Sequence, residues 1–196
     1  MKNKTPKLCL FGIVSLLLFM QLRCKENAEK PPKTVMPEIT QEGKNTIGCY
    51  VNGELYAVPS IVKLNEINSE YNNDYDVPNL KSLNINSGNG VKSNIEQHLN
   101  LFLIKNIIDT GMYSLTQEIN SFSGKKRDKA YYSKFINRSK SQSYICPKNA
   151  YGWMHISKFD TISRIVSGTF EFDAVNKENA DDKIEIRTGR FDIKIN

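Results

Sequence analysis

The stretch VSGTFEFDAV, residues 166–175, alternates apolar and polar side chains and decides the expected fold. Phe170, Phe172 and Ala174 fall on one side, and the residues between them are polar: Thr169, Glu171 and Asp173. A period of two is typical of a β-strand with one buried face, because successive side chains of a strand point to opposite faces. The stretch therefore predicts a strand that buries its aromatic face.

The same period recurs along the rest of the chain. It appears in the segments 80–86, 111–119, 152–158 and 191–195. Polar intervals rich in Asn and Ser separate these segments, as they do in sheets of short antiparallel strands. The sequence therefore predicts an all-β fold, either an antiparallel sandwich or a partly closed barrel.

A β-hairpin is predicted at residues 46–58. Two arms with apolar residues flank the pair Asn52-Gly53. This pair tolerates the positive φ angles that a type I′ turn requires. Pro59 follows the second arm and ends it, because proline cannot donate a hydrogen bond to a sheet.

Residues 95–108 fit two structures. Several of their apolar residues have helical spacing, but LNLFLI (99–104) is an almost continuous apolar run. Such a run fits a strand buried on both faces as well as a helix. The turn signal DTG (109–111) that follows favours a strand, and a helix is the alternative.

The N-terminal residues have the parts of a secretory signal. Lys2, Lys4 and Lys7 form a basic region, and an apolar run follows at 8–20. That run is shorter than the about 20 residues of a membrane-spanning helix, and it fits the apolar region of a signal peptide. We therefore assign residues 1–23 to a lipoprotein-type signal peptide.

Cys24 marks the boundary between the apolar run and a polar segment. The polar segment, residues 24–45, contains three prolines and few apolar residues, which predicts a disordered tether. The position of Cys24 predicts cleavage before it and lipidation of its thiol, although Arg23 is a poor residue at such a cleavage site. The alternative is an uncleaved N-terminal anchor. Either outcome tethers a single β-domain, residues 46–196.

Two further cysteines, Cys49 and Cys146, belong to the predicted domain. In an exported protein two such thiols favour one disulfide bond, which we predict here. The alternative is a pair of buried free thiols that pack as small apolar side chains.

The charge of the chain argues against nucleic acid as a partner. The whole chain has a net charge of +6, but four of its basic residues lie in the predicted signal peptide, and the rest carries +2. One dense basic cluster remains, GKKRDK (124–129). Nucleic-acid-binding proteins have a wider basic surface than this, so we interpret the cluster as a solvated loop.

No motif of catalysis, metal binding or cofactor binding occurs, so no catalytic residue, metal or cofactor is predicted. The acidic pairs Asp74/Asp76 and Asp181/Asp182 are interpreted as solvated loop charge. A possible ligand surface is formed by aromatic residues and a histidine. Trp153 and His155 share a strand face, and two tyrosines lie in or beside predicted loops: Tyr131 and Tyr132.

Several short motifs occur together in one order. They are TIGCYVNGELY (46–56), GMYSL (111–115), ISKFD (156–160), IVSGTFEF (165–172) and TGRFD (188–192). In this combination the chain resembles a family of small uncharacterised lipoproteins from Bacteroidetes-type bacteria. The resemblance covers most of residues 46–196 and implies an all-β domain tethered to the outer membrane. It supplies no catalytic residue.

The resemblance also implies a location and a modification. It places the protein in the cell envelope as an outer-membrane lipoprotein, facing the periplasm or the cell surface. Bacteria of this kind attach O-glycans at Asp-Ser/Thr-apolar sequences, and Asp160-Thr161-Ile162 fits, with Thr161 as the acceptor. We expect a binding module for a glycan, a small ligand or an envelope protein rather than an enzyme. The alternatives are an assembly subunit of an outer-membrane complex and a hydrolase without a readable motif.

Overall fold

The computed structural model describes residues 35–58, 67–74, 79–89, 96–119, 126–127, 129–137 and 140–196. Every regular element in these ranges is a β-strand, and every paired strand is antiparallel to its neighbour. The predicted all-β class is therefore confirmed. The predicted signal peptide, Cys24 and Asp76 lie outside the described residues.

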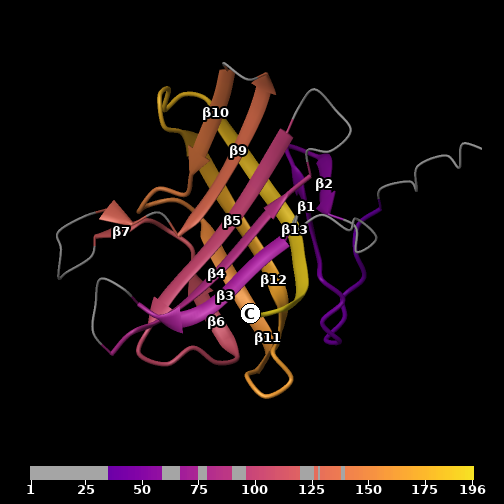
Figure 1. The fold of residues 1–196 in the computed structure, drawn as a ribbon. Helices are drawn as coiled ribbons and strands as arrows, with labels where there is room; N and C mark the ends of the chain where they lie inside the picture. Colours follow the sequence, from indigo (N-terminus) through magenta and orange to yellow (C-terminus); the bar gives the residue numbers. More distant parts are fainter. Residues whose placement is uncertain are drawn as a thin grey trace, which may run out of the picture. The chain divides into compact units, whose positions relative to one another are not determined.

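Eleven strands form one sheet in which β2-β1-β13-β12-β10-β9-β5-β4-β3 is the order of neighbours, and β11 and β6 branch from β12. The sheet curls into a half-barrel, with β3, β4 and β5 in front of β12 and β13 in Figure 1. Two short strands, β7 and β8, pair separately. The bounds are β1 (Thr46–Val51), β2 (Glu54–Val58), β3 (Ile67–Asn73), β4 (Lys81–Gly88), β5 (Glu96–Lys105), β6 (Gly111–Ser114), β7 (Glu118–Ile119), β8 (Lys126–Arg127), β9 (Ala130–Asn137), β10 (Lys140–Ile145), β11 (Gly152–Asp160), β12 (Ile165–Asn176) and β13 (Lys183–Lys194).

The opening stretch of the sequence lies in β12, which is the centre of the fold. Phe170, Phe172 and Ala174 are almost fully buried, and the residues between them are partly exposed, as the alternation predicts. One edge of β12 serves two strands: its first part pairs with β11 and its end pairs with β10. The sheet therefore branches at β12 and separates an outer β11–β6 wing from the β10–β3 wall.

The core fills the concave side of the curled sheet. Leu83, Ile85, Leu99 and Leu101 from β4 and β5 are at most 1% exposed. Strand β3 contacts the C-terminal end of β13 through Ser69. The Ser69 hydroxyl donates to the Lys194 carbonyl at 2.6 Å, and the Asn196 amide donates to the Ser69 carbonyl at 3.0 Å. These bonds bring β3 to the end of β13 and partly close the barrel.

The two local expectations about strands are confirmed. Asn52 and Gly53 have φ angles of 49° and 82° and join β1 to β2 in the register Val51↔Glu54. The ambiguous apolar run forms β5, so the helical alternative is wrong. Its inner side chains are core residues, and its outer Phe102 lies under the Arg127 guanidinium at 5.4 Å, which explains an apolar run on both faces.

The ordered chain begins before the boundary predicted at residue 46. Residues 35–45 lie along the outer face of β12 and β13, and Asp192 of β13 holds them. This carboxylate, which is 1% exposed, accepts hydrogen bonds from the Thr40 and Ser167 hydroxyls at 2.5 and 2.7 Å. It also accepts three backbone amides, at 2.8–3.2 Å: Glu42, Gly43 and Lys44. We call these groups the Asp192 cluster, and residues 35–45 the strap.

The electrostatics of the Asp192 cluster follow from its donors. Burial opposes ionisation of Asp192, but the hydrogen bonds from Thr40, Ser167 and the strap amides outweigh it and lower its pKa to about 2. The carboxylate is therefore charged at neutral pH. It fixes the strap to the domain through groups that the chain itself supplies.

Candidate functional site

Trp153 and His155 lie on the outer face of β11, as the alternation predicts, while Met154 between them and Ile156 after them are fully buried. In the β-ladder Trp153 stands opposite Glu171 of β12, and His155 stands opposite Met112 of β6. Met112 is 63% exposed. The two predicted residues therefore belong to an accessible sheet surface with aromatic, apolar and charged groups.

A hydrogen-bonded chain fixes the aromatic rings of this surface. The Trp153 Nε1 donates to the Tyr151 hydroxyl at 2.6 Å, and that hydroxyl donates to Glu171 Oε2 at 3.1 Å. The Arg187 guanidinium lies over the Tyr151 ring at 5.4 Å and pairs with Asp173. We call Tyr151, Trp153, Glu171 and Arg187 the outer shelf. Its rings are held in place before any ligand arrives.

A groove of about 210 Å³ runs beside Trp153. Gly189 lines the groove, and a Cβ at this position would lie 2.5 Å from the Phe170 carbonyl oxygen, so the close approach of the two strands requires glycine here. Arg190 on the far side is held by the Pro37 carbonyl of the strap at 3.0 Å. The lining residues are Ile39, Trp153, Thr169, Phe170, Glu171, Thr188, Gly189 and Arg190. The groove thus combines one aromatic wall with hydroxyl, carboxylate and guanidinium groups.

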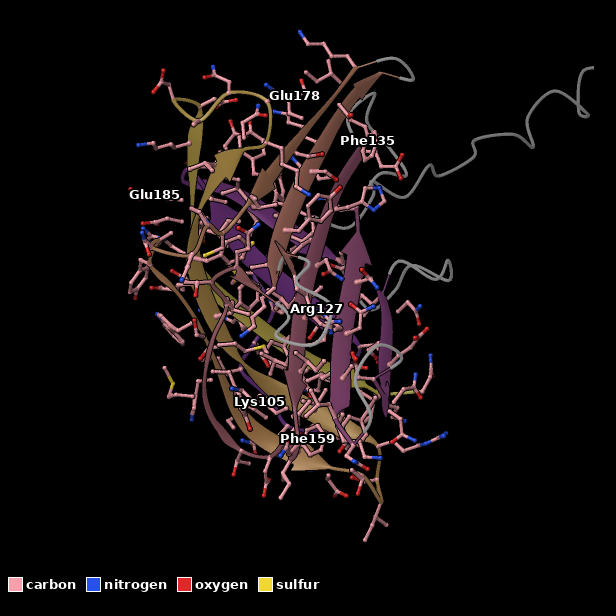
Figure 2. All side chains as sticks on the ribbon, turned by 90° about the vertical axis from the view of Figure 1, so that its left-hand side faces the viewer. Lys105, Arg127, Phe135, Phe159, Glu178 and Glu185 are labelled. Atoms are coloured by element: carbon pink, nitrogen blue, oxygen red, sulfur yellow. The ribbon has the colours of Figure 1, made fainter. Side chains whose placement is uncertain are left out.

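A second hollow lies inside the half-barrel, at the end where β9 meets β10 and β12 meets β13. Figure 2 shows this end by Phe135 and Glu178, with Lys105 and Phe159 at the opposite end. We call it the mouth cavity, and its volume is about 240 Å³. It is lined by Val51, Asn52, Glu54, Leu55, Tyr56, Gln97, Tyr132, Lys134, Gln142, Tyr144, Asp182 and Ile184.

Strand register arranges the wall of the mouth cavity in rows. Gln97, Lys134 and Gln142 are direct neighbours on β5, β9 and β10. The next row inward contains Tyr132 and Tyr144, whose ring centroids are 6.2 Å apart. The cavity therefore has a polar rim with amides and an ammonium above a tyrosine floor.

The three tyrosines of the cavity differ in their hydrogen bonds. The Tyr56 hydroxyl is 2.8 Å from Ser87 Oγ, and the Tyr144 hydroxyl donates to Asp182 at 2.9 Å. Burial raises the pKa of Tyr144 to about 12, and its bond to Asp182 adds to the shift. The Tyr132 hydroxyl has no hydrogen-bond partner in the part of the chain that the structure describes, although this residue is only 3% exposed.

The predicted surface residues do not form one site. Tyr131 and Tyr132 lie in β9 rather than in a loop, and they point to opposite faces of the sheet. Tyr132 faces the cavity, whereas the Tyr131 ring lies outside beneath the Lys177 ammonium at 5.6 Å. The structure therefore separates these tyrosines from Trp153 and His155.

The predicted disulfide is not formed. Cys49 and Cys146 are free, fully buried thiols, and burial raises the pKa of each to about 12. Their strands, β1 and β10, are separated in the sheet by β13 and β12. Three strand spacings amount to about 14 Å along the sheet, whereas a disulfide needs Cα atoms within about 7 Å. The prediction was wrong, and the alternative of packed free thiols is correct.

Three charged side chains assigned to solvated loops are instead partly or fully buried. Arg127 and Asp74 form an ion pair at 2.9 Å with side chains that are 15% and 6% exposed. Lys129 is 5% exposed. The basic cluster is therefore part of the fold at these positions, and the expected solvated loop is corrected there.

Thr161 lies at the exposed turn between β11 and β12. The Asp160 carboxylate shapes this turn, because it accepts the Ile162 and Ser163 amides, each at 2.9 Å. Hydrogen bonds from Ser163 lower the pKa of Asp160. The turn leaves Thr161 accessible to solvent.

Comparisons with known proteins give no identity. No protein family, no curated protein and no solved structure matches the chain. Within the described ranges, no group of three or more His, Cys, Asp or Glu side chains is arranged to hold a metal ion. The same ranges contain no helix with the length and apolarity that a membrane span requires.

Proposed function

We propose that this protein is a lipid-anchored module of the cell envelope that binds a glycan at the groove beside Trp153. The observation that carries the proposal is the fixed aromatic wall of the outer shelf next to a groove with polar groups. Sugar rings have apolar C–H faces and hydroxyl edges, so an aromatic wall flanked by hydrogen-bonding side chains complements both.

The geometry supports a sugar ring more than an extended apolar partner. Thr169, Glu171 and Arg190 supply a hydroxyl, a carboxylate and a guanidinium within one groove. Such groups bind vicinal hydroxyls through charge-assisted hydrogen bonds. Trp153 is already oriented by Tyr151, so little side-chain entropy is lost on binding.

Trp153 also reports on binding, because it is the single tryptophan of the chain. The full chain is purified in detergent and titrated with bacterial polysaccharides and their oligosaccharide fragments while Trp fluorescence is recorded. A saturable change in Trp153 emission is expected for at least one glycan. Absence of any fluorescence change or calorimetric heat across the panel would overturn the proposal.

Variants locate the site. Trp153→Ala is expected to weaken glycan binding by about thirtyfold, since a buried tryptophan contact contributes about 2 kcal/mol. Tyr151→Phe is expected to weaken it less, because the ring stays and only its hydroxyl bonds are lost. Phe135→Ala is the matched control, because Phe135 is an exposed aromatic residue of β9 that lies outside the groove.

The anchor rests on the sequence pattern around Cys24 and on the resemblance to envelope lipoproteins. We propose that Cys24 is lipidated and that the protein resides at the outer membrane. Expression with a palmitate analogue tests this proposal. Cys24→Ala is expected to abolish labelling and to release the protein from the membrane fraction, and unchanged labelling of the variant would exclude Cys24 as the lipid site.

Thr161 is proposed as an O-glycan acceptor on the same basis, and its exposed turn supports access. Mass spectrometry of the protein expressed in a Bacteroidetes-type bacterium is expected to show a glycan on the peptide that contains Asp160-Thr161-Ile162. Thr161→Val keeps the size of the side chain and removes the acceptor hydroxyl. A glycan mass that persists in this variant would reject the assignment.

A further inference from the structure

The mouth cavity differs from the groove beside Trp153 in its position and in the chemistry of its lining. It lies inside the half-barrel, and it has polar groups that the chain leaves unpaired. A cavity of 240 Å³ has room for about eight water molecules at about 30 Å³ each. It therefore fits a ligand with roughly eight non-hydrogen atoms, smaller than the ligands of the typical 300–1,000 Å³ site.

The charged groups of the cavity are of both signs. Glu54 and Asp182 supply carboxylates, and Lys134 supplies an ammonium. None of the three forms an ion pair within the described ranges. Asp182 accepts hydrogen bonds from the neutral groups Tyr144 and Asn176, at 2.9 and 2.8 Å.

The Tyr132 hydroxyl is an independent indication of a ligand. Among the described residues Ser133 Oγ is the one fully buried polar side-chain atom without a hydrogen-bond partner, so the Tyr132 hydroxyl is open to the cavity, where water or a ligand can bond to it. Tyr132 is 97% buried, and its side chain lines the cavity between the Lys134 row and the core. Burial raises its pKa well above the usual range, and the Glu54 carboxylate adds to this effect, so the hydroxyl stays a donor at neutral pH.

We propose that the mouth cavity binds a zwitterion of amino-acid size, which carries one ammonium and one carboxylate. The ligand carboxylate accepts from the Lys134 ammonium and the Tyr132 hydroxyl. The ligand ammonium donates to Glu54 and lies against the tyrosine rings, whose faces attract cations. The Gln97 and Gln142 amides at the rim are placed to bind the rest of a polar ligand.

Other classes of small ligand fit this set of groups less well. A neutral sugar would cover Glu54 and Lys134 without neutralising either, and a buried charge without an opposite partner is costly. A simple amine would leave Lys134 unpaired, and a simple carboxylic acid would leave Glu54 unpaired. A zwitterion satisfies both charges and the free hydroxyl at once.

Calorimetric titration of the full chain in detergent with the free L-amino acids tests the proposal. At least one is expected to bind with a Kd below about 1 mM. Its N-acetyl derivative, which lacks the ammonium, and its amide, which lacks the carboxylate, are each expected to bind at least about tenfold more weakly. Equal binding of the three forms, or no binding by any amino acid, would overturn the proposal.

Isosteric variants assign the ends of the ligand. Glu54→Gln is expected to lower the affinity for the free amino acid about tenfold. In this variant the free amino acid and its N-acetyl derivative are expected to bind with similar affinity. Lys134→Gln is expected to lower the affinity for the free amino acid by a similar factor. In this variant the free amino acid and its amide are expected to bind with similar affinity. Lys105→Gln is the matched control, because Lys105 is an exposed lysine at the opposite end of β5. Variants at Glu54 and Lys134 that bind as the parent protein does would contradict the assignment.

Tyr132→Phe separates binding from folding. It removes the unpaired hydroxyl and keeps the ring, so the unliganded variant is expected to fold with the melting temperature of the parent or higher. Its affinity is expected to fall about tenfold. An unchanged affinity would contradict the role of Tyr132. Trp153→Ala is expected to leave amino-acid binding intact. The variant therefore distinguishes a failure of the amino-acid proposal for the mouth cavity from a failure of the glycan proposal for the groove beside Trp153.

Discussion

The Asp192 cluster and the mouth cavity are both polar sites in a largely apolar fold, but the chain completes only one of them. Asp192 is 1% exposed and receives five hydrogen bonds from the strap and Ser167. Tyr132 is 3% exposed, and none of the described residues forms a hydrogen bond with its hydroxyl. A buried polar group that the chain satisfies stabilises the fold. One that the chain leaves unpaired lowers stability unless a ligand or water completes it.

Removing the charge at Asp192 is expected to have the largest effect on stability. In Asp192→Asn an amide NH₂ replaces one oxygen and faces donors from Thr40 or Gly43. The expected loss is about 2–4 kcal/mol of unfolding free energy, measured by urea denaturation. Asp181→Asn, at an exposed carboxylate, is the control and is expected to change stability by less than about 0.5 kcal/mol. A loss below about 1 kcal/mol at Asp192 would remove the contrast between the two sites.

Acid is expected to weaken the same cluster reversibly. The folded pKa of Asp192 is about 2, below the ordinary value of 3.8 for an aspartate, so the unfolded chain takes up the proton first as the pH falls. The contribution of about 2 kcal/mol is therefore complete above about pH 5 and is lost progressively between about pH 5 and pH 2. Urea unfolding at several pH values measures it. The Asp192→Asn variant is expected to lack this part of the pH dependence, and an identical pH profile would refute the assignment.

Tyr144 provides an intermediate case within the mouth cavity. Tyr144→Phe removes the hydroxyl that donates to Asp182, which keeps the Asn176 amide as a partner. A typical intramolecular hydrogen bond contributes about 1 kcal/mol, and a loss of this size is expected in urea unfolding. A loss as large as that of Asp192→Asn would show that the cavity wall depends on this bond for its fold.

Tyr132→Phe is expected to have the smallest effect and to sharpen the comparison most. Because its hydroxyl faces the cavity and bonds to none of the described residues, its removal is expected to change the unfolding free energy by less than about 0.5 kcal/mol, or to raise it. The difference in unfolding free energy between Tyr132→Phe and Tyr144→Phe, measured in the same buffer, compares a hydroxyl that the chain bonds with one that it does not. A loss above about 1 kcal/mol would mean that the chain already satisfies Tyr132.

The elements with a local signal were predicted well. Period-two alternation gave the faces of β11 and β12, and Asn52-Gly53 gave the first hairpin. Alternation also places Tyr131 and Tyr132 on opposite faces once β9 is known. Their assignment to a loop hid this, because the Lys- and Ser-rich flanks of β9 resemble turn sequences.

The features that depend on distant residues were not predictable. The strap contains polar residues and prolines like a tether, and its partners lie more than 100 residues away in the chain, with Asp192 accepting most of its hydrogen bonds and Arg190 and Lys158 donating others. The free state of Cys49 and Cys146 follows from the strand order, which local patterns do not contain. The mouth cavity combines β2, β9, β10 and the β12–β13 turn, and its strongest signal, the unpaired Tyr132 hydroxyl, exists only in three dimensions.

The strap also determines how a pulling force would enter the domain. Tension applied from the N-terminal side reaches residues 35–45 first, so the hydrogen bonds to Asp192 bear the load before the β1–β13 pairing does. Ile39 of the strap lines the groove beside Trp153, and Pro37 holds Arg190 there. If the proposed anchor and the proposed glycan site are both correct, tension would loosen one wall of the groove before it unfolded the sheet, and load would favour release of the ligand.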